Sequence, residues 1–159
     1  MQIKKLPDEH TEQKNYFKLI NSMMNKHPEL ILTHSVPNGS LRNKIIGSKL
    51  KAEGVKSGVL DISIPIPKHG YNGLYIEMKR LVKSELSENQ KFFLNYLNDL
   101  GYVAIVAKGA IQAFDYTKQY LAGYQLPVER YQIDKFKFNK KTGLSKQYQR
   151  SALERGYTN

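Results

Sequence analysis

The chain of 159 residues contains no cysteine, which excludes disulfides, thiolate metal sites and cysteine nucleophiles. Long apolar runs are also missing: none approaches the roughly 18 residues of a membrane-spanning helix, and the N-terminus shows no signal-peptide stretch. The length is that of one domain with a single core. From these absences we expect a cytoplasmic protein of ordinary globular composition.

Acidic residues are scarce, because 14 Asp and Glu stand against 25 Lys and Arg, which leaves a net charge of +11. A polyanionic partner suits such a charge, since basic side chains that bind phosphates release counterions from nucleic acid. A basic protein without such a partner has the same composition. Charge alone therefore leaves both interpretations open.

Apolar periodicity predicts a first helix over residues 8–27, with Asp8 or Thr11 at its start. This helix should end before Pro28, because proline disfavours a helical residue before it. The short apolar run Leu30-Ile31-Leu32 is expected to be a strand or the entry to one.

Further elements follow in alternation. Residues 41–53 carry a weaker helical pattern closed by Gly54, and a later helix capped by Ser87 has a predicted core face at Phe92, Phe93, Tyr96, Leu97 and Leu100. Residues 102–107 predict a strand buried on both sides, and residues 110–122 predict a last helix. The order predicts an α/β fold in which helices flank a mixed β-sheet.

The sequence changes in character near residue 124, so we divide it into a domain over residues 1–123 and an extension over residues 124–159. The extension interleaves aromatic residues with eight basic and three acidic residues. Such interleaving suits base stacking and phosphate contact on a nucleic acid. The alternative, which we favour because tails are basic for many reasons, is a polar tail that packs over the domain or over a second subunit.

Residues 59–79, VLDISIPIPKHGYNGLYIEMK, predict two strands joined by a turn, yet charged residues occupy strand positions. If the turn centres near residue 69, Asp61 lies directly opposite Glu77, with Cβ atoms roughly 4.5–5.5 Å apart. A turn centred one residue later would offset the pair. Glu77 and Lys79 share a face, because side chains alternate along a strand. The hairpin is therefore expected to gather two carboxylates and an ammonium.

Two carboxylates that face each other raise each other's pKa, so the arrangement calls for a positive charge between them. A salt bridge of Lys79 is one explanation, and it would contribute about 1 kcal/mol at most. A divalent cation is the other, because Mg²⁺ binds one or two protein carboxylates and keeps waters and phosphate oxygens as its remaining ligands.

The run resembles the Asp…Glu-x-Lys signature of the PD-(D/E)XK nuclease superfamily, and more closely the VRR-NUC family (virus-type replication-repair nuclease). The likeness extends over about residues 9–122 in ordered blocks: Glu9 to Gln13, Pro37-Asn38-Gly39 with Arg42, residues 50–59 before Asp61, residues 73–80, Leu86-Ser87 to Gln90, and residues 101–107. One departure is Leu60, which stands where the family usually has proline. The resemblance implies a restriction-endonuclease-like core.

The same resemblance implies roles for individual residues. Asp61, Glu77 and the backbone carbonyl of Met78 would bind Mg²⁺ or Mn²⁺, and Lys79 would position or activate the attacking water. Glu12 would complete the acidic cluster, directly or through a metal-bound water; alternatively it is a solvated helix residue. The final candidate is Gln90, whose amide would hydrogen-bond the lysine or a water, unless it is an ordinary surface glutamine.

Contacts to DNA are expected from a second group of residues. Its members are Lys49, Lys51 and Lys56 around a glycine-rich block, with Asn38 and Arg42 as further candidates. In this block Gly54 and Gly58 would let the backbone approach a phosphate, although a helix end followed by a turn has the same residues. The four histidines have no metal-ligand spacing and are expected at the surface.

These residues together predict a Mg²⁺- or Mn²⁺-dependent endonuclease for branched DNA, such as four-way (Holliday) junctions, of a kind that phages and bacteria use in DNA repair. Symmetric cleavage of two strands needs two sites, so a homodimer is expected. The alternatives are a non-catalytic DNA-binding module with a structural ion pair, a flap-cutting or nicking nuclease, and a restriction-type nuclease of the same superfamily.

Overall fold

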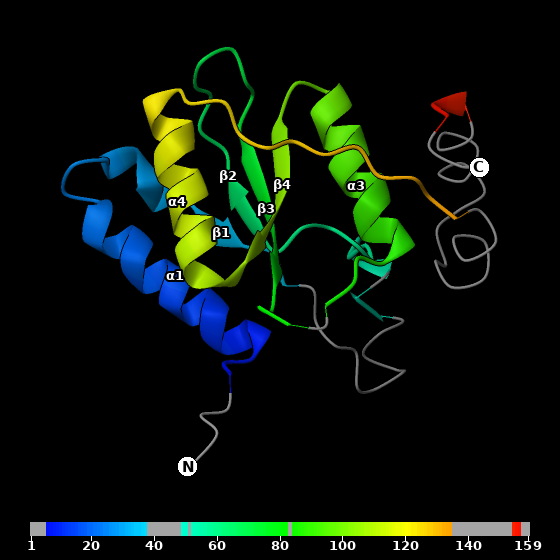
Figure 1. The fold of residues 1–159 in the computed structure, drawn as a ribbon, viewed down its shortest axis with the longest axis horizontal. Helices are drawn as coiled ribbons and strands as arrows, with labels where there is room; N and C mark the ends of the chain where they lie inside the picture. Colours follow the sequence, from blue (N-terminus) through cyan, green and yellow to red (C-terminus); the bar gives the residue numbers. More distant parts are fainter. Residues whose placement is uncertain (1–5, 38–48, 51, 83, 135–153, 157–159) are drawn as a thin grey trace.

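The computed structural model describes residues 6–37, 49–50, 52–82, 84–134 and 154–156. Its centre is a four-stranded sheet in the order β1 (His34–Ser35), β2 (Ile62–Ile64), β3 (Leu74–Lys79) and β4 (Val103–Lys108). The pairs β1–β2 and β2–β3 are antiparallel, whereas β3 and β4 are parallel. The sheet is mixed and has helices on both faces, so the predicted α/β class is confirmed (Figure 1).

Two helices cover one face of the sheet, α1 (Glu9–Met23) and α4 (Gly109–Ala122), and they pack against each other (Figure 1). The Asp8 side chain caps α1 as predicted, because it accepts a hydrogen bond from Thr11 N–H at 2.8 Å. Tyr16 lies fully buried between the helices, and its hydroxyl lies 3.0 Å from that of Thr117. The larger core of the molecule lies on this face.

The opposite face carries α3 (Glu88–Asp99), which begins at the predicted cap Ser87. Its predicted core face was partly wrong. Phe92 is buried, but Leu94 and Asn95 are buried as well, and Leu100 is 49% exposed. The reason is that Leu100 is the C-cap of the helix, where the chain already turns toward β4. Leu94 packs instead with Leu60 and Ala104 in a smaller core.

Of the two alternatives for Leu30-Ile31-Leu32, the strand was wrong and the entry to a strand is confirmed, because a 3₁₀ helix (Pro28–Leu32) occupies the segment and leads into β1. Proline at the first position has the fixed φ angle that starts a helical turn. Only Leu30 is buried, which is the one-sided burial of a helical turn. The strand begins later, at His34, and pairs with Ser63. The helix expected over residues 41–53 lies mostly outside the described residues.

The register of the hairpin agrees with the prediction. Ile62 pairs with Ile76 and Ile64 with Leu74, so the turn centres on residue 69. His69 takes the left-handed conformation there, with φ of 51°, and its ring Nε2 lies 3.1 Å from the carbonyl oxygen of Leu121 in α4. The hairpin turn is therefore held against the end of α4.

Residues 124–134 cross from the end of α4 to α3 in an extended path (Figure 1). The Asn95 side chain makes two hydrogen bonds with the backbone of Tyr131, one to each polar group, at 2.8 and 3.0 Å. Ile133 is fully buried, and Asp134 N–H donates to Glu88 at 2.7 Å. This part of the extension packs over the domain. None of the described helices is long and apolar enough to cross a membrane.

Candidate metal and catalytic centre

The centre is built where β2 and β3 run side by side. Asp61 directly precedes β2, and one further step of the observed register places it opposite Glu77. The Asp61 carboxylate is fixed by the backbone, since Met78 N–H donates to its Oδ2 at 2.8 Å. The expectation that the hairpin gathers these two carboxylates agrees with this geometry.

Glu77 is the most deeply buried charged residue of the described chain, with 1% of its surface exposed. Burial raises the pKa of its carboxyl to about 8, and the neighbouring Asp61 adds to the shift, whereas Lys79 opposes it. Its Oε2 finds no hydrogen-bond partner in the part of the chain that the structure describes. A buried carboxylate oxygen without a hydrogen-bond partner needs an explanation, and a bound cation would provide one.

Lys79 and Gln90 surround the other oxygen of this carboxylate. Lys79 Nζ lies 2.9 Å from Glu77 Oε1, and Gln90 Nε2 donates to the same oxygen. Gln90 Oε1 in turn accepts from Lys79 at 3.2 Å and from Ser87 N–H at 2.9 Å, as part of the capping box of α3. The first turn of α3 is thus joined to the charged residues of β3, and Gln90 is not an ordinary surface glutamine.

The donor set fits a hard divalent cation. Two carboxylates from adjacent strands are what Mg²⁺ takes from a protein, and Glu77 Oε2 lacks any other partner among the described residues. The carbonyl of Met78 is a suitable third ligand, because the N–H and C=O of one strand residue point to the same side and this N–H already meets Asp61. No group of three His, Cys, Asp or Glu side chains suited to a metal occurs among the described residues.

Glu12 does not join such a group. It is 8% exposed, and its Oε2 accepts a hydrogen bond from Ala110 N–H in the first turn of α4 at 2.7 Å. A carboxylate there accepts a hydrogen bond from a backbone N–H of α4 that has no partner within the helix. Its negative charge also interacts favourably with the positive end of the helix dipole. It is therefore not a solvated helix residue either. Glu9, one turn earlier, lies close enough for its charge to raise the pKa of Glu77.

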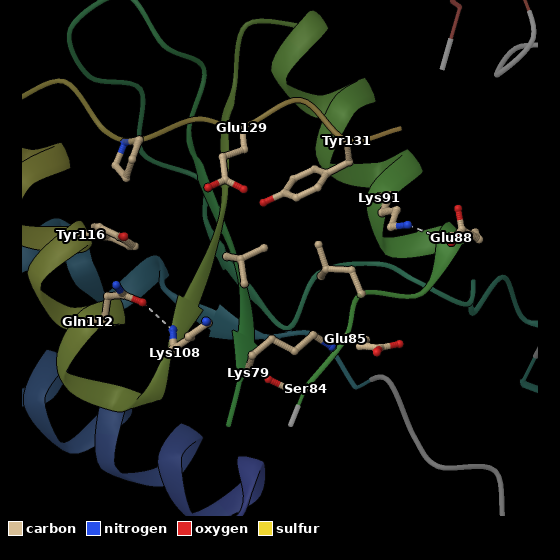
Figure 2. A pocket seen from close by; sticks show the side chains of 13 residues that line it. Lys79, Ser84, Glu85, Glu88, Lys91, Lys108, Gln112, Tyr116, Glu129 and Tyr131 are labelled. Atoms are coloured by element: carbon tan, nitrogen blue, oxygen red, sulfur yellow. Dashed lines mark hydrogen bonds and ion pairs between the residues drawn. The ribbon is translucent and has the colours of Figure 1, made fainter. Parts of the chain in front are cut away.

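Two cavities of about 640 Å³ reach the centre, one at Lys79 and the other at Asp61. The first, which we call the α3–α4 cleft, reaches Lys79 and is lined on its far side by Glu129 and Tyr131 of the extended segment (Figure 2). The Glu129 carboxylate and the Tyr131 phenol point toward each other in this view. The second, the α1 groove, runs between α1 and residues 35–37 and reaches Asp61.

The residues predicted to contact DNA are only partly visible. Asn38, Arg42 and Lys51 lie outside the described residues, whereas Lys49 and Lys56 are exposed. Neither of these two lines the cavities beside the centre.

The glycines of the same block differ from each other. A Cβ on Gly58 would meet Asn89, including its backbone carbon at 2.7 Å, so this glycine lets the chain approach the first turn of α3. The close approach that Gly58 allows is made to the start of α3, and an approach of this block to a phosphate stays a prediction. A Cβ on Gly54 would meet nothing within 4 Å, and its φ of 99° is that of a turn.

Three features of the site and its surroundings were not predicted from the sequence. Glu9 belongs to the first block of the family resemblance, but no periodicity marks a residue whose charge acts on another element. The buried position of Asn95 was not predicted either, since an asparagine within a helix is expected to be exposed. The basic positions of α1 that line the α1 groove did have a signal, which is their spacing of four residues.

The comparisons with known proteins agree with one another. The family of the VRR-NUC domain matches residues 2–111. A solved structure described as a "VRR_NUC domain protein" is similar in fold, with a TM-score of 0.61 and 29% sequence identity over 74% of this chain and 91% of that one. No curated protein matches the sequence.

Proposed function

This chain belongs to the VRR-NUC domain family, and we propose that it is a Mg²⁺- or Mn²⁺-dependent endonuclease that hydrolyses phosphodiester bonds in branched DNA. One observation carries the proposal: the buried Glu77 Oε2 has no hydrogen-bond partner among the described residues and lies across the register from Asp61. Two adjacent carboxylates, one of them buried, are costly without a cation between them. A divalent ion would meet this need.

The residues of the chain can divide the chemistry among them. When bound there, a divalent cation supplies Lewis-acid stabilisation and lowers the pKa of the attacking water. Asp61 and Glu77 would hold it, together with the Met78 carbonyl. Lys79, 2.9 Å from Glu77, would orient the attacking water or stabilise the charge that develops on the phosphate. Gln90 holds the lysine in place.

The substrate class follows from charge and family. A net charge of +11 favours a polyanion, and a nuclease domain acts on nucleic acid. We propose DNA as the substrate, with four-way junctions as the preferred structure and a homodimer as the cutting unit, because two strands need two sites. Repair or resolution of DNA in the cytoplasm of a bacterial or phage-infected cell would be the setting.

One rival function is supported by a specific contact. Lys79 already forms an ion pair with Glu77, so the cluster would persist as a structural element in a DNA-binding module without catalysis. Flap-cutting, nicking and restriction-type nucleases of the same superfamily share the catalytic residues and differ in the substrate that they select.

The decisive experiment is cleavage of labelled four-way junction, flap and duplex DNA in Mg²⁺ or Mn²⁺, together with the solution mass of the protein. Wild type and Lys118→Ala, which removes an exposed lysine of α4, should cut the junction, whereas Lys79→Ala should not. Equal rates for Lys79→Ala and wild type would refute the mechanism.

Calorimetric titration with Mn²⁺ separates the nuclease from the binding module. Binding that disappears in Asp61→Asn supports the metal site, and absence of binding to wild type supports the rival. Cleavage confined to one duplex sequence would indicate a restriction-type enzyme.

A further inference from the structure

A stripe of basic side chains runs along α1. His10, Lys14 and Lys18 follow one another at intervals of four residues, and all three are exposed. Residues four apart lie on the same face of a helix and about 6 Å apart along its axis. This rise is close to the distance between successive phosphates of one DNA strand. Neither lysine forms an ion pair within the described part of the chain.

The stripe lies in the α1 groove and not on an open helix surface. All three basic residues line that cavity, with Ser35, Val36 and Pro37 on its opposite wall. Three uncharged side chains of α1 complete the helix wall, namely Gln13, Phe17 and Asn21. The one acidic residue among the described lining residues is Asp61, the proposed metal ligand. The groove therefore carries its basic residues on the helix wall and reaches the centre at Asp61.

The position of α1 relative to the centre gives the groove a direction. The first turn of α1 supplies His10, which lines the same groove as Asp61, and the helix packs against β3. Each later turn lies farther along the helix axis, because α1 is a regular helix of 15 residues. The start of α1 and the end of β3 lie at the same end of the sheet (Figure 1). Lys14 and Lys18 would thus meet a strand that leaves the site on the Asp61 side.

We propose that the α1 groove binds the sugar-phosphate backbone of the DNA strand on the Asp61 side of the scissile bond, with Lys14 and Lys18 on neighbouring phosphates. The proposal rests on the proposed nuclease function and adds to it a place for the substrate. Lysine contacts to phosphate position a strand without reading its sequence. This mode suits an enzyme that selects DNA by structure.

The experiment measures the salt dependence of DNA binding by the full chain in EDTA, which prevents metal-dependent cleavage. Wild type and the double variant Lys14→Ala/Lys18→Ala are compared by fluorescence anisotropy with a labelled four-way junction. The slope of log K against log salt should fall by about two in the double variant, because each lysine–phosphate contact contributes about one. Thermal melting of each variant verifies that it is folded.

The matched control is Lys26→Ala/Lys118→Ala, which makes the same change in net charge with two exposed lysines that do not line the groove. Its slope should stay near that of wild type. Equal slopes for the two double variants would overturn the proposal. A second result would also overturn it: Lys14→Ala/Lys18→Ala binds DNA as wild type does but no longer binds polyglutamate. The groove would then bind an acidic protein and not DNA.

The outcome can be separated from that of the proposed function. If wild type cleaves the junction in Mn²⁺ and the slopes are equal, the nuclease assignment stands and the groove assignment fails. If wild type cleaves no DNA and the slope still falls, the groove is a DNA-binding site of a non-catalytic module.

Discussion

Gln90 in α3 accepts a hydrogen bond from Lys79 in β3 at 3.2 Å, and the same amide belongs to the capping box of its own helix. One side chain therefore has two tasks, since it stabilises the start of α3 and holds Lys79, the proposed catalytic lysine, beside Glu77. The two tasks can be separated by mutation, because the Ser87 hydroxyl contacts Gln90, at 3.2 Å from its Oε1, whereas the contact with Lys79 comes from Gln90 itself.

The Gln90→Ala variant should reduce DNA cleavage by about 10- to 100-fold, which is typical when a residue that supports metal ligands is removed. Ser87→Ala is the control: it removes the hydroxyl of the capping box at a cost of about 1 kcal/mol but keeps the Ser87 N–H that donates to Gln90 Oε1, so Gln90 stays beside Lys79. Cleavage rates are measured below the melting temperature of both variants. If Ser87→Ala lowers the rate as much as Gln90→Ala, helix stability and not orientation explains the effect.

Glu12→Ala should destabilise the fold by about 1–3 kcal/mol, because Ala110 N–H at the start of α4 loses its buried acceptor. Glu12→Gln keeps an acceptor oxygen and should retain most of this stability. Denaturant unfolding of the three proteins checks the prediction. A Glu12→Gln variant with wild-type stability but no cleavage would instead show a role at the metal, as the family resemblance implies.

Stability of the metal-free protein should fall between about pH 4.5 and pH 8. The folded-state pKa of Glu77 is about 8, above its ordinary value of 4.5, so the folded protein binds more protons than the unfolded chain in this window. The stability that the protonated carboxyl contributes is present in full below pH 4.5 and is lost as the pH rises to 8. Melting temperatures in EDTA across this window measure the effect.

The control for this pH dependence is Glu77→Gln, which cannot titrate. Histidines also change charge in part of the same range, so the quantity of interest is the difference between wild type and variant. That difference should change in favour of the variant as the pH rises. A difference that is constant with pH would show that Glu77 is ionised throughout.

Gly58→Ala should destabilise the fold by several kcal/mol, since the new Cβ would collide with Asn89 at a residue whose φ is 88°. Gly54→Ala is the matched control. Its φ is 99°, but the space around it is empty, so only the backbone strain of about 1–2 kcal/mol remains. Denaturant unfolding compares the two. Equal losses would mean that α3 moves aside without cost.

Asn95→Ala should destabilise the fold by about 2–3 kcal/mol, because the backbone N–H and C=O of Tyr131 both lose their partner. Asn95→Asp retains the acceptor for Tyr131 N–H and should lose less. Limited proteolysis provides a second measurement: cleavage within residues 124–134 should become faster in Asn95→Ala. Unchanged proteolysis would show that other contacts of this segment, such as the buried Ile133, hold it alone.

Local chemistry made much of the site predictable from the sequence. Asp8 and Ser87 predict helix starts, because their short side chains can accept hydrogen bonds from backbone N–H groups of the first turn. Both side chains accept such a bond in the structure. The alternation of side chains along a strand placed Glu77 and Lys79 on one face, and the length of the turn set the register that brings Asp61 opposite Glu77. These relations involve residues close in the chain, so the sequence determines them.

Tertiary structure decided what depends on distant segments. Glu12 binds the start of α4, 98 positions later, and no helical period announces such a partner. The burial that raises the pKa of Glu77 comes from elements packed around β3, and Gly58 is needed because α3 lies against it. The sequence by itself determined which residues we propose for the chemistry. Packing decided the pKa values of these residues, their hydrogen-bond partners and the cavities that lead to them, because burial and electrostatic fields depend on the folded chain.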